Sequence, residues 1–78
     1  MPHISIKMLA GRTEEQKKKA AEAVKNALAE SLNMGDHYIT VAIEDYTAEE
    51  WQEVFRTEIT DKPDKVYVKP NYDPKSLL

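Results

Sequence analysis

Two segments with the alternation of β-strands flank one segment with the period of a helix, and this order leaves few folds open. Ile4, Ile6 and Met8 alternate with polar residues between positions 3 and 9, which predicts a half-buried strand. Residues 38–43 form a nearly continuous apolar and β-branched run, which predicts a strand covered on both faces. Because the connections are short, we expect a right-handed crossover between two parallel strands.

The segment between the two strands has the start, the period and the end of a helix. Thr13 and Gln16 supply the two halves of a capping box after the break at Gly11. Small and apolar residues then recur at three- and four-residue steps through positions 20–32. They build a narrow face suited to close packing on a sheet, and residues 33–36 end the helix.

A second, shorter helix is expected after the second strand. Thr47 and Glu50 form another capping box, and an amphipathic pattern follows from Trp51 to Ile59. A loop is expected over residues 60–64. Residues 66–68 (VYV) predict a short edge strand, and a tail interrupted by prolines completes the chain.

The chain has only 78 residues and no cysteine, which limits how much of a core it can build alone. A domain of this size buries only about 60% of the surface that its unfolded chain exposes, and no disulfide compensates. We expect a single α/β (α+β) domain over residues 1–78, with a β-α-β fold of two parallel strands and one long and one short helix. Two helices cannot cover both faces of the sheet, so we expect a homo-oligomer whose sheets join across the interface.

The charge balance argues against a polyanion partner. The chain has 11 Lys and Arg against 14 Asp and Glu, a net charge of −3. In the one basic run, residues 17–19, Lys18 and Lys19 lie at the i,i+4 spacing of ion pairs with Glu14 and Glu15. A solvated helix face is therefore expected and not a nucleic-acid site. The apolar runs are shorter than the roughly 20 residues of a membrane span, and no apolar leader is recognised, so a cytoplasmic protein is expected.

Pro2 has the most distinctive chemistry in the chain. Processing removes an initiator methionine when a small residue or proline follows, so the mature chain is expected to begin with Pro2. An N-terminal proline carries a secondary amine, and α-amino groups titrate at about 7.7 to 8.0. Burial in an apolar pocket or a nearby cation lowers such a pKa, which produces a general base near neutral pH. The alternative is chance, since proline makes up about 5% of ordinary sequences.

Arg12 follows Gly11 in the turn between the first strand and the first helix. Its guanidinium is suited to bidentate binding of a carboxylate, and the alternative is a solvated residue near a helix start. A cation at this end opposes the helix dipole, which favours the binding interpretation. Extended residues rise about 3.3 Å each, so Pro2 and Arg12 lie more than about 20 Å apart in one chain. They can share a pocket only across a subunit interface.

Three further side chains have types that are common in binding sites. Trp51 begins the second helix, where an indole either packs in the core or walls a pocket that excludes water. His3 and His37 lack the paired or clustered spacing of metal ligands, so no metal site is expected. No glycine-rich phosphate loop is present, and no cofactor is expected.

The chain resembles the 4-oxalocrotonate tautomerase family, within the tautomerase superfamily, at three places. These are Met1-Pro2, the strand at residues 3–9 and the run from Gly11 to Lys17 (GRTEEQK). The resemblance continues through residues 27–32, the second strand and Trp51. The tail, with residues 69–72 (KPNY), is more similar to the small bacterial para-phenylpyruvate-type tautomerases, which are homodimers.

The resemblance implies a cofactor-independent tautomerase that interconverts enol and keto forms of 2-oxo acids. Pro2 would be the catalytic general base, Arg12 would bind substrate carboxylate or carbonyl, and Trp51 would line the pocket. It implies a dimer or a trimer of dimers, with the tail favouring the dimer. Where the family has a second substrate-binding arginine, this chain has Thr40. A hydroxyl binds a carbonyl but cannot anchor a second carboxylate, so 2-oxo monocarboxylates, including aryl ones, are expected substrates.

Two alternatives remain open from the sequence. Other members of the superfamily add water to 3-substituted acrylates as hydratases or dehalogenases, and Glu44 or Glu50 would then activate the water. That reaction prefers a protonated proline, so its dependence on pH is opposite. The other alternative is a non-enzymatic oligomeric module in which Pro2 is incidental.

Overall fold

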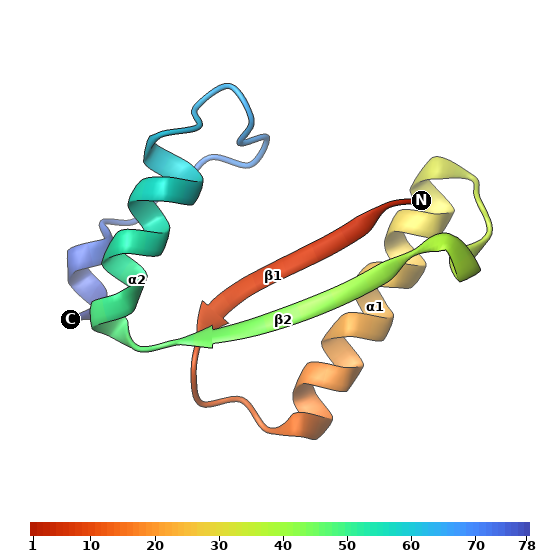
Figure 1. Cartoon of the computed structure of the whole chain (residues 1–78), viewed down its shortest axis with the longest axis horizontal. Coiled ribbons are helices and arrows are strands. Elements are labelled where there is room, and N and C mark those ends of the chain that lie inside the picture. The colour runs from red at the N-terminus through yellow and green to blue at the C-terminus, as the bar shows by residue number, and fades with distance from the viewer. The chain divides into compact units, whose positions relative to one another are not determined.

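The computed structural model describes all residues from 1 to 78 and contains one two-stranded sheet and two α-helices (Figure 1). In chain order the elements are β1 (His3–Leu9), α1 (Glu14–Leu32), β2 (Thr40–Tyr46) and α2 (Ala48–Phe55). β1 and β2 are parallel neighbours, so the expected β-α-β crossover is confirmed. The chain forms two compact units, Met1–Asp45 and Tyr46–Leu78.

Local sequence signals set both ends of α1 in the first unit. The Thr13 hydroxyl accepts from the Gln16 N–H at 3.1 Å, and Gln16 Oε1 accepts from the Thr13 N–H at 2.9 Å, which confirms the expected capping box. Gly11, at φ 131°, makes the turn before the helix in a conformation that residues with a Cβ rarely adopt. Asn33 ends α1 at φ 52°, the left-handed region that asparagine tolerates.

One face of the sheet lies against α1. Lys17 of α1 donates to Asp45 Oδ2 at 2.7 Å, and a small hollow between the elements is lined by Ala21 together with Val41 and Ile43. Because side chains alternate along a strand, the odd-numbered residues of β2 face α1 and the even-numbered ones face away.

The opposite face of the sheet carries polar pairs in register. His3 Nδ1 lies 2.6 Å from Thr40 Oγ1, and Lys7 Nζ lies 3.1 Å from Glu44 Oε1. Both pairs are separated by 37 residues, so one register holds along the sheet. Ser5 lies between them and accepts from Lys7 at 3.0 Å.

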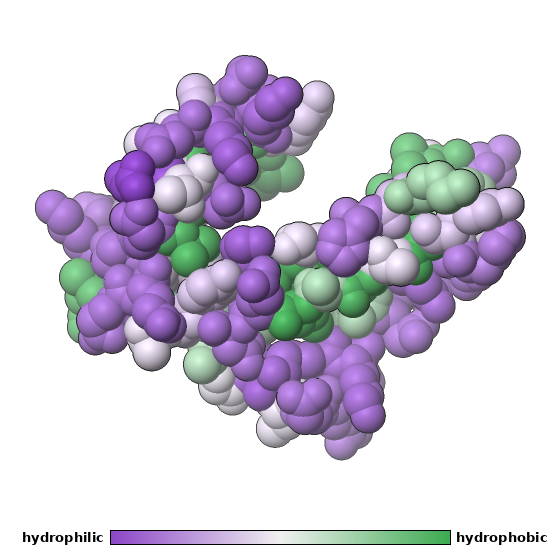
Figure 2. Space-filling model, in the orientation of Figure 1, coloured by the Kyte–Doolittle hydropathy of each residue, from purple (hydrophilic) through white to green (hydrophobic).

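The core of the chain is small. Ile39, at 7% exposure, is its only buried side chain. Ile4, Ile6 and Met8 alternate as expected but are only half-buried, and Figure 2 shows apolar surface along the strands. The apolar surface that the sequence supplies is thus incompletely covered within one chain.

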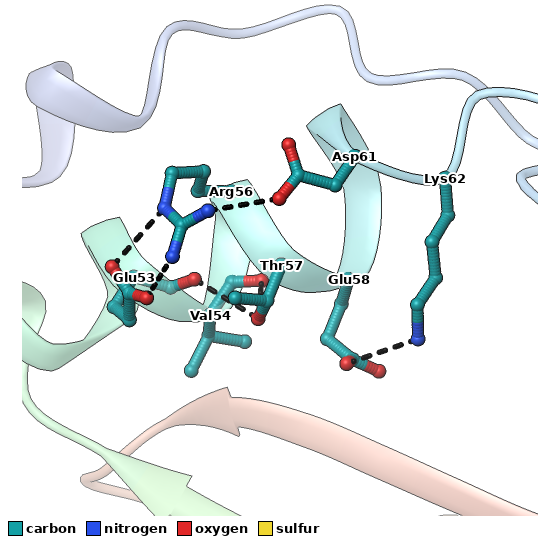
Figure 3. Close-up of polar contacts among 7 residues, drawn as sticks. All are labelled: Glu53, Val54, Arg56, Thr57, Glu58, Asp61 and Lys62. Carbon is teal, nitrogen blue, oxygen red and sulfur yellow. Dashed lines mark hydrogen bonds and ion pairs between the residues drawn. The ribbon is translucent and has the colours of Figure 1, made fainter.

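In the second unit, α2 continues into a wider π-helical turn, η2 (Arg56–Thr60). Its capping box, Thr47 with Glu50, is confirmed. Figure 3 shows the charged side chains around the turn, where Arg56 pairs with Glu53 and with Asp61, the latter at 2.9 Å. These pairs hold both ends of the wider turn.

The second strand is displaced from its expected position. Residues 36–38 form a short 3₁₀ turn, with the Ile39 N–H donating to the Asp36 carbonyl at 3.1 Å, and β2 begins only at Thr40. The strand runs on to Tyr46 because Glu44 and Asp45, which are polar, find lysine partners on β1 and α1. The apolar run alone did not reveal those partners.

The expected edge strand at residues 66–68 is wrong. No strand forms there, and Tyr67 and Val68 are 95% and 89% exposed. A strand needs a hydrogen-bonded neighbour, and the second unit contains only the last residue of β2. Neither α1 nor α2 has the length and apolarity needed to traverse a membrane.

Candidate active site

Pro2 lies directly before β1 and beside the start of β2. Its carbonyl accepts from the Thr40 N–H at 3.2 Å. Pro2 is half-buried, whereas Met1 before it is 88% exposed. The parallel register therefore brings together two of the expected site residues, Pro2 and Thr40, at one end of the sheet.

His3 completes this end of the sheet. Its Nδ1 lies 2.6 Å from the Thr40 hydroxyl, on the face away from α1. Sequence reasoning weighed His3 only as a metal ligand and missed this contact. The expected parallel strands place residues 3 and 40 at the same end of the sheet, but the register that makes them direct neighbours is not encoded in the local pattern.

Arg12 lies at the other end of β1 and does not meet Pro2 within the chain. The seven residues of β1 separate them, which is about 23 Å at 3.3 Å per residue. Arg12 is exposed and has no hydrogen-bond or ion-pair partner in the chain. All five of its N–H donors are therefore available to a carboxylate or to another chain.

Trp51 lies in the first turn of α2, in the second unit. Its indole N–H donates to Tyr72 Oη at 3.1 Å, and its ring meets Tyr46 edge-on at 6.4 Å between centroids. Tyr72 in turn packs edge-on against Phe55 at 5.6 Å. Sequence reasoning named Trp51 but missed Tyr72, although the tail had been singled out for its resemblance to the small bacterial tautomerases.

The two carboxylates named for water activation are engaged elsewhere. Glu44 pairs with Lys7 at 3.1 Å and lies four residues along β2 from Thr40, about 13 Å away at 3.3 Å per residue. Glu50 accepts from the Thr47 N–H at 2.8 Å within the capping box of α2. Within the first unit, Glu44 therefore lies away from Pro2.

Two hollows of the chain are lined by other residues than those expected at the site. One, of about 620 Å³, is at the C-terminal end of α1 beside Asn33 and Asp36. A smaller apolar one, about 180 Å³, lies in the second unit beside Phe55 and Val66. Neither includes Pro2 or Arg12. No group of three His, Cys, Asp or Glu side chains has the arrangement of a metal site.

The shifted pKa values belong to structural ion pairs. Hydrogen bonds to Asp45, then to Glu14, raise the pKa of Lys17, and a hydrogen bond to Glu22 raises that of Lys25. The hydrogen bond from Arg56 lowers the pKa of Glu53. The pair with Asp45 joins α1 to β2, whereas the pairs with Glu14 and Glu22 lie within α1. The pair of Arg56 with Glu53 lies at the end of α2.

Comparison with known proteins identifies the family to which the chain is similar. The family described as "Tautomerase enzyme" matches residues 2–53. The chain is similar to Tautomerase PptA of an Escherichia coli strain, at 34% identity over 73 residues, which are 92% of this chain and 97% of that protein. It is also similar to probable tautomerases of Bacillus cereus and Bacillus anthracis, each at 49% identity over 45 residues, which are 58% of this chain and 74% of those proteins.

The family match begins at Pro2 and extends past Arg12, Thr40 and Trp51. The relative from Escherichia coli aligns along nearly its whole length. The chain therefore belongs to the tautomerase family and is an isomerase of the tautomerase type.

Proposed function

We propose that this tautomerase interconverts the enol and keto forms of 2-oxo monocarboxylic acids, aryl ones included, with Pro2 as the general base after removal of Met1. The observation that carries the proposal is the position of Pro2, held at the end of the sheet beside a neutral hydroxyl by the 3.2 Å bond from Thr40 N–H. The 88% exposure of Met1 supports its removal, because a processing enzyme needs access to that residue.

The reaction needs one group that takes a proton and returns it to another atom. The Pro2 amine takes the proton of the enol hydroxyl, and the O–H electron pair forms the C=O bond. The electron pair of the C=C bond then takes the proton back from the prolinium at carbon 3. General acid–base catalysis of this kind contributes about 10²- to 10⁴-fold in rate.

Arg12 of a neighbouring chain would bind the substrate carboxylate. Within one chain β1 holds Arg12 away from Pro2, and its guanidinium has no internal partner. A homo-oligomer in which the start of one β1 lies near the end of another would join the two. We favour a dimer over a trimer of dimers, and the small core supports assembly, since only Ile39 is buried within one chain.

Thr40 in place of a second arginine supports a substrate with one carboxylate. Its hydroxyl can hydrogen-bond a carbonyl or enol oxygen but carries no charge. Trp51 would wall the pocket and exclude water, which strengthens charge interactions and favours the neutral amine.

The test combines intact mass with catalysis on protein purified without an N-terminal tag. We expect a mass lacking Met1 and catalysed ketonisation of phenylenolpyruvate. A matched sample with extra residues before Pro2, which turn its amine into an amide, should lose nearly all activity. Full activity of that extended chain would exclude Pro2 as the base, and retained Met1 with no activity would favour the non-enzymatic module.

A further inference from the structure

The side chains of His3 and Thr40 are in contact beside Pro2. The β-α-β fold itself does not require a histidine and a threonine at these two positions. His3 Nδ1 and Thr40 Oγ1 are 2.6 Å apart, on the sheet face away from α1. The backbone N–H of the same Thr40 is bonded to the Pro2 carbonyl at 3.2 Å. A substitution of the Thr40 side chain therefore alters a position next to Pro2, the proposed base.

The hydrogen bond between these side chains has two possible directions, and they differ in what Thr40 offers to a ligand. A hydroxyl has one hydrogen and two lone pairs, and a neutral imidazole donates from one ring nitrogen and accepts at the other. If Nδ1 accepts, the Thr40 hydrogen is used and only lone pairs remain for a ligand. If Nδ1–H donates, the Thr40 hydrogen is free to donate to an oxygen beside Pro2.

The chemistry at Pro2 requires the second direction. The oxygen of a 2-oxo/enol pair gains negative charge as its proton leaves, and it is stabilised by a donor and destabilised by lone pairs. A chain of two donors, Nδ1–H to Oγ and O–H to substrate, also polarises each bond in the same sense. His3 is exposed, so its Nε2 can accept from water in this state.

We infer that His3 is a positioning residue, whose Nδ1–H holds the Thr40 hydroxyl so that its hydrogen points to the reacting oxygen of the substrate. The inference rests on the proposed function and deepens it, because it explains how a neutral Thr40 serves where the family has a cation. His3 does not itself touch the substrate.

The first test reads the tautomer directly and needs no activity. Nitrogen-15 NMR of labelled protein at about pH 8, where an ordinary imidazole is neutral, distinguishes a proton on Nδ1 from one on Nε2. We expect the Nδ1–H form for His3 in the protein lacking Met1. A proton on Nε2, with Nδ1 as acceptor, would overturn the inference.

The second test measures kcat and KM for phenylenolpyruvate. Thr40→Val removes the hydroxyl at nearly constant shape and should lower kcat by about tenfold to hundredfold, with a smaller change in KM. His3→Leu should cause part of that loss in the wild type and none in the Thr40→Val background. His3→Asn, which keeps an amide near the position of Nδ1, should restore activity to within about threefold of wild type.

The controls separate this inference from the proposed function. Ser5 lies two residues after His3 on the same face of β1. The control variant Ser5→Ala should therefore retain wild-type kcat. Equal losses from His3→Leu with and without the Thr40 hydroxyl, no rescue by His3→Asn, or an equal loss from Ser5→Ala would overturn the role of His3. In each of those outcomes the wild type is still active, whereas an inactive wild type lacking Met1 would overturn the proposed function.

Discussion

The indole N–H of Trp51 donates to Tyr72 Oη at 3.1 Å, and this bond joins α2 to a residue 21 positions further along the chain. Gln52, the next residue, donates to the Pro74 carbonyl at 2.9 Å. Tyr72 also packs edge-on against Phe55. Trp51, which is proposed to wall the pocket, and its neighbour Gln52 therefore hold the C-terminal segment on α2.

Removing the Tyr72 hydroxyl should loosen Trp51 without removing the aromatic contact. Tyr72→Phe keeps the ring against Phe55 but leaves the indole N–H without its acceptor, which should cost about 0.5 to 1.5 kcal/mol in free energy of unfolding. Trp51 is the single tryptophan, so its emission spectrum should change with the substitution. Tyr67→Phe is the control, because Tyr67 is 95% exposed. Equal effects of the two variants would contradict the assigned contact.

A change at Pro2 should separate a base from an acid mechanism. Pro2→Ala replaces the secondary amine by a primary one and should retain part of the rate, whereas an N-terminal extension should lower it by about 10²- to 10⁴-fold. With a base, kcat/KM falls as pH drops below the pKa of the amine, near 7.7 to 8.0 for an ordinary α-amino group. A rate that falls above this pH instead would favour the hydratase or dehalogenase alternative.

Arg12 should act across the subunit interface. Arg12→Ala should lower kcat/KM by about tenfold to hundredfold, because hydrogen bonds to a charged carboxylate are lost. Mixing Arg12→Ala chains with chains extended before Pro2 should restore activity, since each mixed dimer has one complete site. In a dimer the recovery should approach about one quarter of wild type. No recovery, with chain exchange verified by mass spectrometry, would argue that both residues act in one chain.

The N-cap of α1 should contribute measurably to stability. Thr13→Ala removes the acceptor of the Gln16 N–H and should cost about 1 kcal/mol. In a domain of this size such a loss lowers Tm by roughly 4–8 °C. Thr13→Ser keeps the acceptor and should remain near wild type. A Tm for Thr13→Ala that matches Thr13→Ser would show that water replaces the cap at no cost.

Lys17 should make the free energy of unfolding depend on pH in the alkaline range. Its hydrogen bond to Asp45 raises its pKa above 10.5, so the pair stabilises the fold below that pH and is lost as pH rises through the raised value. Thermal melts should show Lys17→Met below wild type at about pH 8, with the difference shrinking above 10.5. Lys18→Met, at a neighbouring position without an ion pair, should show no such convergence. A constant difference across this range would exclude the titration of Lys17 as its cause.

Much of the fold could be predicted from local patterns. The alternation of Ile4, Ile6 and Met8 predicted β1, and the capping boxes at Thr13 and Thr47 predicted where both helices begin. Boundaries were predicted less well where partners lie elsewhere in the chain. β2 extends through Glu44 and Asp45 because lysines of β1 and α1 pair with them, and that pairing is invisible in the apolar run.

The residues of the candidate site could also be predicted from the sequence, whereas their contacts could not. Pro2, Arg12, Thr40 and Trp51 were found from residue chemistry and from a family pattern, because those signals lie in the residue types and their spacing. The contacts of these residues were not found, because contacts depend on which side chains the register and the folded tail bring within bonding distance.

The sequence by itself determined the order of β1, α1, β2 and α2, the helix starts and the identity of the candidate base, since each depends on residues within a few positions of one another. Only the tertiary structure decided that His3 meets the Thr40 hydroxyl and that Tyr72 receives the indole N–H of Trp51. Those pairs are 37 and 21 residues apart, and no local propensity encodes a hydrogen bond at that separation. The contact of His3 with Thr40 forms because the strands pair in one register. The bond from Trp51 to Tyr72 forms because the C-terminal segment turns back onto α2.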